Sequence, residues 1–105
     1  MGGDPSLRLI DANYHFAQGD YTEARRLANE AVKLEPTLAS AYWILVGSSL
    51  AEDDHAETLH QLKMIVEKCN FQLDAVAIKD NDDYKRFVTT KEYSELCGWM
   101  ERRAK

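Results

Sequence analysis

Two stretches of the chain repeat the same pattern of residue types with an offset of 34 positions. The first runs from Gln18 to Pro36, and the second begins at Ala41 and runs to Lys68. This offset is a known period of stacked helix–turn–helix units. Such a unit cannot bury its apolar face alone, so it must pack against a neighbour. The repeat therefore predicts stacked helix pairs, whose usual product is a surface for another protein rather than a catalytic pocket.

Composition favours one all-α domain over residues 1–105. The length suffices for a single small domain. Apolar residues make up 45% of the chain and charged residues 30%, which is too apolar for a disordered protein. Pro5 and Pro36 are the only prolines, and this scarcity favours long helices over many strands and turns.

Charge restricts the class of partner. The formal net charge of −5 disfavours nucleic acid, because the phosphate backbone would repel the chain. Residues 1–60 carry ten acids and four bases, whereas residues 61–105 carry eight and nine. The first half therefore favours a basic partner, with an ordinary solvated helical surface as the alternative. No apolar run approaches the ~20 residues of a membrane span, and no signal peptide is visible, so we expect a cytoplasmic protein without a membrane partner.

Capping residues divide the repeat region into four helices. Asp4 and Pro5 mark a start, as an N-cap and a first-turn proline. Gly19 and Asp20 mark a turn, because Gly adopts the left-handed conformation readily and Asp caps the helix that follows. Either Asp53 or Asp54 should cap the fourth helix. The predicted helices cover residues 5–17, about 21–34, about 38–51, and from the Asp53–Asp54 cap to about 69.

Apolar residues recur at helical spacing within these helices. The sets are Leu7, Ile10, Tyr14 and Ala17 in the first helix; Ala24, Ala28, Ala31 and Val32 in the second; and Leu59, Leu62, Ile65 and Val66 in the fourth.

The types and spacings of these residues resemble the tetratricopeptide repeat over residues 5–70. The first unit matches at Gly19, Tyr21, Ala24, Ala28, Ala31 and Pro36, and the second at Tyr42, Leu45, Leu62 and Ile65. It departs from the pattern at Arg8, Asp11, His15, Val46, Ser49, Thr58 and Asn70. The resemblance implies an α-α superhelix, a right-handed solenoid of helical hairpins. Repeat one would span about 5–36, repeat two about 39–70, and a helical cap about 73–103.

The tail leaves the repeat pattern after residue 70. Residues 73–78 predict a truncated helix, residues 80–83 a polar turn, and residues 84–88 a short helix capped by that turn. Thr89 and Glu92 resemble a capping box at the start of a last helix, with Tyr93, Leu96, Cys97 and Met100 on one face. The tail is similar to the segment that terminates some bacterial tetratricopeptide arrays. That similarity implies that the end of the stack is hidden by Phe87, Tyr93, Leu96 and Trp99, which would cover Leu62 and Ile65.

Ligands of the tetratricopeptide family usually lie in the concave groove lined by the first helix of each unit. The resemblance places on this face Ser6, Leu9, Asn13 and Phe16 from unit one, and Ser40, Trp43, Gly47 and Leu50 from unit two. Each set recurs at i, i+3, i+7 and i+10, one face of a helix. The implied function is a non-catalytic adaptor that binds a peptide or partner helix, anchored by Phe16 and Trp43. The alternative is that both aromatics are core residues packed against the tail or a neighbouring repeat.

A second functional hypothesis is self-association, either as a homodimer or within a longer array. An apolar repeat face left open at the N-terminal end would drive it. Arg8, Asp11, Arg25 and Arg26 oppose this hypothesis, because they predict that the first face is polar. Should the groove not be the contact surface, the convex helices with Arg25, Arg26 and Glu30 offer another.

No enzyme, metal or cofactor is expected from the titratable residues. His55 and His60 are five positions apart, whereas a helical metal pair needs three or four. The acids of residues 80–83 lack the central Gly and terminal Glu of a calcium loop. Cys69 and Cys97 lie outside any CxxC pair, so we expect two reduced thiols.

Overall fold

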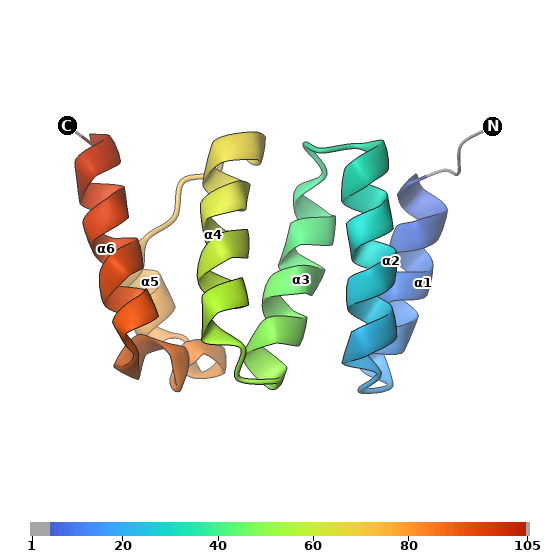
Figure 1. Ribbon diagram of the computed structural model, residues 1–105, viewed down its shortest axis with the longest axis horizontal. Coiled ribbons are helices and arrows are strands. Elements are labelled where there is room, and N and C mark those ends of the chain that lie inside the picture. Colours follow the sequence, from blue (N-terminus) through green and yellow to red (C-terminus); the bar gives the residue numbers. More distant parts are fainter. Residues whose placement is uncertain (1–4, 105) are drawn as a thin grey trace.

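The computed structural model describes residues 5–104, which form six α-helices and two short 3₁₀ segments. No strand occurs in this range, so the all-α prediction is confirmed. The elements are α1 (Pro5–Ala17), α2 (Tyr21–Leu34), α3 (Ala39–Ala51), α4 (His55–Cys69), α5 (Ala75–Asp80), η1 (Asp82–Tyr84), η2 (Phe87–Thr89) and α6 (Lys91–Ala104). They follow one another along a slab of 42 × 29 × 18 Å, with the two ends of the chain at opposite ends of the row (Figure 1).

The first four helices match their predicted bounds closely, because local signals fix their ends. The largest difference is at the start of α3, which begins at Ala39 rather than Leu38. Asp4, the predicted first N-cap, lies outside the described residues.

The α1–α2 and α3–α4 turns share one geometry at positions 34 residues apart. Gly19 has φ 80° and Asp53 has φ 55°, so both lie in the left-handed region. Asp is among the few residues besides Gly that adopt this conformation readily. In each turn the next N–H, of Asp20 or Asp54, donates to the carbonyl five residues earlier at 2.9 Å. These are the bonds of the Schellman motif, which turns the chain back on itself.

The same two turns cap the helices that follow them. The Asp20 carboxylate accepts a hydrogen bond from the Glu23 N–H at 3.3 Å, and Asp54 accepts from the Glu57 N–H at the same distance. Asp54 is therefore the N-cap of α4, and Asp53 is the left-handed residue before it.

Small residues let the hairpins approach closely. Ala12, Ala24, Ala28, Ala31 and Ala41 are fully buried along the first three helices. Between α3 and α4 the close contact is polar, since the hydroxyls of Ser49 and Thr58 share a buried hydrogen bond of 2.7 Å. Both residues depart from the family pattern, and their mutual hydrogen bond satisfies two hydroxyls that burial would otherwise penalise.

The apolar spacing in α1 predicted the helix, but three of its four residues face solvent. Leu7, Ile10 and Tyr14 are 59%, 63% and 62% exposed, and we call these three residues the outer stripe. The buried side of α1 holds Ala12, with Leu9 and Phe16 packed against the core. The following hairpin approaches α1 from that side, so the opposite side has no neighbour among the described residues.

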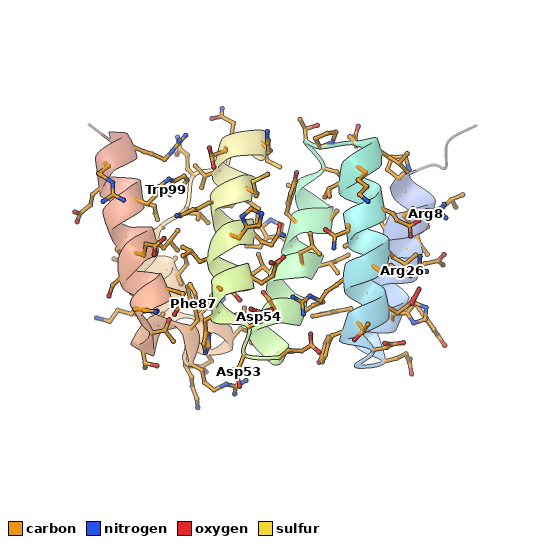
Figure 2. The ribbon with its side chains drawn as sticks, viewed as in Figure 1. Arg8, Arg26, Asp53, Asp54, Phe87 and Trp99 are labelled. Carbon is orange, nitrogen blue, oxygen red and sulfur yellow. The ribbon has the colours of Figure 1, made fainter. Side chains whose placement is uncertain are left out.

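The first face is therefore mixed rather than uniformly polar as expected, since the outer stripe is apolar whereas Asp11 beside it is exposed. Arg8 lies beside Glu30 of α2 at 3.8 Å, and Arg26 bonds to Glu23 and Glu30 (Figure 2). Arg25 reaches the other way, to Glu52 at 2.6 Å and Asp54 at 3.1 Å. These arginines pair with acids of α2 and of the α3–α4 turn, while Arg26 and Glu30 stay partly exposed. A convex contact surface with Arg25, Arg26 and Glu30 stays a prediction.

The elements α5, η1, η2 and α6 close the other end of the row, and we refer to them as the cap. Phe87 and Leu96 are fully buried in one cluster with Leu62 and Ile65, as expected. Tyr93 and Trp99 pack against the same cluster. Polar bonds add to this closure: the Tyr93 hydroxyl donates to the Ala75 carbonyl at 2.9 Å, and Lys63 of α4 pairs with Glu95 of α6 at 3.2 Å.

Two details of the tail differ from prediction. The expected helix over residues 84–88 is replaced by the 3₁₀ segments η1 and η2. The expected capping box is also shifted, because α6 begins at Lys91 and Glu92 is then its second residue, one position too early. Thr90 caps α6 by accepting from the Tyr93 N–H at 3.4 Å, while Thr89 donates to the Arg86 carbonyl.

Replacing Phe87 with Ala should lower the free energy of unfolding by about 3–5 kcal/mol, because the change leaves a cavity where the cap meets α4. Phe71→Ala is the matched control, since Phe71 is 42% exposed and should cost about 1 kcal/mol or less. Urea denaturation followed by circular dichroism measures both variants. Equal losses would show that Phe87 does not hold the cap in place.

Candidate binding groove

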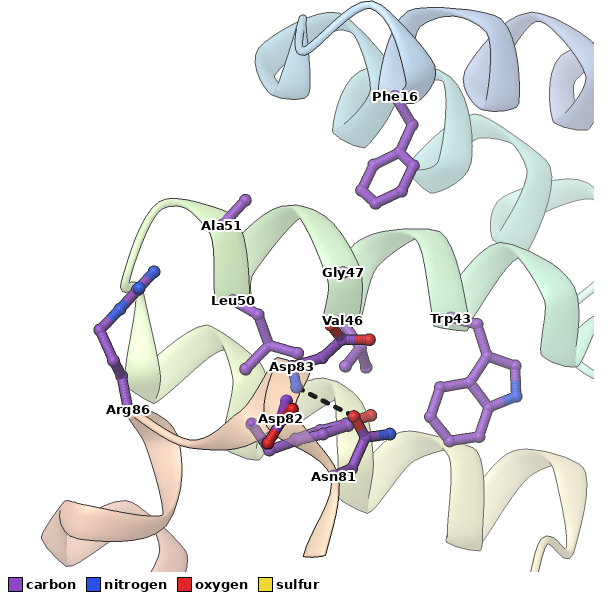
Figure 3. Close-up of a pocket in the computed structure, with 11 residues that line it drawn as sticks. Phe16, Trp43, Val46, Gly47, Leu50, Ala51, Asn81, Asp82, Asp83 and Arg86 are labelled. Carbon is purple, nitrogen blue, oxygen red and sulfur yellow. Dashed lines mark hydrogen bonds between the residues drawn. The ribbon is translucent and has the colours of Figure 1, made fainter. Parts of the chain in front are cut away.

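A groove lies between α3 and the segment Asn81–Arg86, which we call the cap loop. Its volume is about 790 Å³. Helix α1 contributes Phe16, helix α3 contributes Trp43, Val46, Gly47, Leu50 and Ala51, and the cap loop contributes Asn81, Asp82, Asp83, Tyr84 and Arg86 (Figure 3). The groove therefore has an apolar wall from the helices and a polar wall from the cap loop.

Phe16 reaches the groove because position 47 has no side chain. A Cβ at Gly47 would lie 2.9 Å from the Phe16 Cζ, which is closer than real contacts of this kind. The Phe16 ring also meets Tyr21 edge-on, with centroids 5.5 Å apart. The glycine thus allows an aromatic ring from the first hairpin to lie directly on the second.

Trp43 stands where the apolar wall meets the cap. Its ring is half-buried and meets Phe71 edge-on at a centroid distance of 5.3 Å. It also lines a neighbouring cavity of about 240 Å³, together with Phe71, Ile78 and Tyr84. Trp43 therefore packs against the tail on one side and remains accessible on the other, and its role as an anchor for a partner stays a prediction.

The cap loop is held by its own hydrogen bonds and by one ion pair. The Asn81 side-chain oxygen accepts from the Asp83 N–H at 2.9 Å, which fixes the 3₁₀ turn (Figure 3). Arg86 donates to the Asp53 carboxylate at 2.6 Å. The left-handed residue of the α3–α4 turn is thereby joined to the end of the groove.

The polar wall of the groove contains the carboxylates of Asp82 and Asp83 and the phenol of Tyr84. Within residues 5–104, Asp82 and Asp83 have no cationic side chain at ion-pair distance. Burial raises the pKa of Tyr84, and the neighbouring Asp83 charge raises it further. The Tyr84 hydroxyl therefore stays protonated at neutral pH, whereas the exposed acids beside it provide negative charge.

Four of the expected site residues line this groove: Phe16, Trp43, Gly47 and Leu50. Leu9 packs against the core, and Ser6, Asn13 and Ser40 are exposed outside the lining. Helical spacing placed all eight on equivalent faces. The cap loop, however, lies alongside α3, so the groove includes α3 residues from Trp43 to Ala51 but only Phe16 of α1.

Sequence reasoning missed the residues of the cap loop. It assigned the acids of residues 80–83 to helix capping, which Asn81 alone performs for η1. Their place in the groove follows from the packing of the cap on α3 and α4, and no repeat position in the family pattern corresponds to them. The run of acids directly before Tyr84 was the one available signal.

Other kinds of site find little support in the part of the chain described. No group of three or more His, Cys, Asp or Glu side chains in residues 5–104 could hold a metal ion. None of the described helices has the length and apolar character to cross a membrane. Comparisons of the chain with protein-family models, with curated proteins and with solved structures give no match.

Replacing Gly47 with Ala should displace the Phe16 ring while changing stability by about 1 kcal/mol or less. The added Cβ meets the mobile far end of Phe16, and the better helix propensity of Ala offsets part of the cost. The readout is the set of aromatic proton shifts of Phe16 and Tyr21.

Gly98→Ala is the matched control, because its new Cβ would lie 3.4 Å from an Arg102 nitrogen on α6, which is an ordinary contact with a flexible side chain. It should leave the Phe16 and Tyr21 signals unchanged. Unchanged Phe16 signals in the Gly47 variant would contradict the proposed contact.

Proposed function

We propose that this protein is a non-catalytic adaptor of the tetratricopeptide type, which binds a short peptide or partner helix in the groove between α3 and the cap loop. The observation that carries the proposal is the convergence of Phe16, Trp43 and Leu50 on one concave surface. Exposed aromatic and aliphatic side chains in such a surface are the usual anchors of a protein interface.

The equivalence of the two turns supports the family and the solenoid arrangement. The left-handed residue and the capping Asp each recur after 34 residues, the length of one tetratricopeptide unit. The Tyr42 hydroxyl donates to the Pro36 carbonyl at 2.8 Å, which ties two family-pattern positions across the link between hairpins. We propose that the two units stack as a right-handed superhelix on this basis.

Binding would be largely preformed. The groove walls are helices and a hydrogen-bonded turn, so little ordering entropy would be lost when a ligand enters. Affinity would come from burying Trp43 and Phe16. Cys69 and Cys97 are free thiols, which fits the reducing cytoplasm that we propose as the location.

Replacing Trp43 with Ala should weaken binding by at least about 2 kcal/mol, or roughly thirtyfold, without unfolding the domain. Ligands would first be selected from a phage-displayed library of short peptides and then measured by titration calorimetry. Tyr14→Ala is the control, since Tyr14 is an exposed aromatic on the far side of α1. An equal fall in thermal stability and affinity would make Trp43 a core residue and remove the support for the groove.

A second candidate function, self-association, is favoured by the outer stripe. Leu7, Ile10 and Tyr14 lie opposite the buried Ala12 and follow the three-then-four spacing of a helix–helix seam. The exposed Asp11 lies beside Leu7 and Tyr14 at the edge of the stripe, so two copies would bring like charges near the contact, which opposes tight association. A contact limited to one helix should bury less surface than the about 800 Å² per partner that is usual for a stable interface. This association should therefore be weak.

Replacing Ile10 with Lys should abolish any concentration-dependent dimer, because it places a charge at the centre of the stripe. Val76→Lys is the matched control, as Val76 is 66% exposed on α5 and Ile10 is 63% exposed on α1. Sedimentation equilibrium over a concentration series gives the masses. A wild-type monomer at every concentration, or equal effects of both lysines, would rule out the stripe as the dimer contact.

A further inference from the structure

We infer that the groove selects an unstructured peptide segment in which a Lys or Arg stands next to an apolar or aromatic residue. This inference rests on the proposed function and specifies the chemistry of its ligand. It follows from how charge is distributed over the two walls, which neither the repeat pattern nor the overall composition predicted.

The cap-loop wall carries negative charge that the described part of the protein leaves unpaired. Asp82 and Asp83 both line the groove and have no cation at ion-pair distance within residues 5–104. Figure 3 shows them between Arg86 at one end and Trp43 at the other. The Asp83 backbone is fixed by Asn81, so the position of these acids is set by the turn.

The nearby cations do not cancel this charge. Arg86 also lines the groove, but its Nε donates to Asp53 at 2.6 Å, so that guanidinium is paired with an acid outside the lining. Lys85 shares a small adjoining cavity of about 50 Å³ with Asp82 and Asp83, but it makes no ion pair with either acid and does not line the groove itself. Arg25 is likewise held elsewhere, by Glu52 and Asp54.

The apolar wall faces these acids across the groove and suits the stem of a basic side chain. Lys and Arg bury their methylene stems against apolar surface while the charged head stays in polar surroundings. Leu50 provides such a surface, and the Trp43 ring can attract a cation through its face. An adjacent apolar ligand residue would then occupy the space beside Phe16.

An acidic ligand would fit this site poorly. Its carboxylate would face Asp82 and Asp83, and the whole chain carries a formal charge of −5. Like-charge contacts at an interface discriminate strongly against wrong partners. The groove therefore distinguishes between peptides of the same apolar content by the sign of their charge.

The test uses three matched sets of short synthetic peptides that share one central Leu, Phe or Trp. The flanking positions hold Lys or Arg in the first set, Ser in the second and Asp or Glu in the third. Binding to the full chain is measured by fluorescence anisotropy at low and at high salt. We expect the basic set to bind about tenfold more tightly than the Ser set at low salt, and the acidic set to bind most weakly.

The double variant Asp82→Asn/Asp83→Asn should remove most of the preference for basic flanks and flatten the salt dependence, while binding of the Ser set stays unchanged. Asn is close to Asp in size, and the hydrogen bonds of this turn use the backbone of these two residues. Glu67→Gln/Glu101→Gln is the matched control, because it removes two exposed charges from the last turns of α4 and α6, outside the groove lining. It should leave the preference intact.

The possible outcomes distinguish a failure of the charge preference from a failure of the proposed peptide-binding function. Equal binding of the basic and Ser sets, reduced by Trp43→Ala, would overturn the charge preference and leave the groove as a peptide site. A charge preference that both double variants reduce equally would also overturn it, since net charge alone would then be the cause. Absence of binding by all three sets would overturn both proposals. Should the Asn variant not fold, the salt dependence of the wild type decides: unchanged affinity of the basic set at high salt contradicts the inference.

Discussion

The left-handed turn at the end of α1 and of α3 is the constraint on which the other features depend. Gly19 and Asp53 each reverse the chain within a few residues, and the Asp that follows caps the next helix. Because the turn is short, the two helices of each hairpin must lie close together, and fully buried Ala12, Ala24 and Ala28 make that possible. The apolar surface not used within a hairpin is then available for the next one, which is how α2 comes to pack on α3.

The two ends of this row of helices differ, because the cap covers one end and the other is exposed. At the α4 end, Phe87 and Leu96 of the cap are fully buried in the cluster that contains Leu62 and Ile65. At the α1 end, the outer stripe stays exposed. The groove is a consequence of the closed end, because covering α4 brings the cap loop alongside α3. The Arg86–Asp53 pair is exposed, so its contribution to stability is small and its main effect is to orient the loop.

The candidate site was only partly accessible from the sequence. Phe16, Trp43, Gly47 and Leu50 were placed on one face by helical spacing and by the family resemblance, and they line the groove. Asp82, Asp83 and Arg86 were not placed there, since no local rule states which surface a loop will approach. The acid excess of the first half pointed to a basic partner, but the unpaired acids of the groove come from the second half of the chain.

The sequence by itself determined the first four helices and the turns within the two hairpins, because these depend on interactions among residues a few positions apart. It also determined the period of the repeat, which the two equivalent turns reproduce. Only the tertiary structure decided which side of α1 faces solvent, since amphipathic spacing defines a face without saying what covers it. It likewise decided that the cap loop forms 3₁₀ turns and that Asp82 and Asp83 face an apolar wall. Both features depend on how the tail packs across α3 and α4.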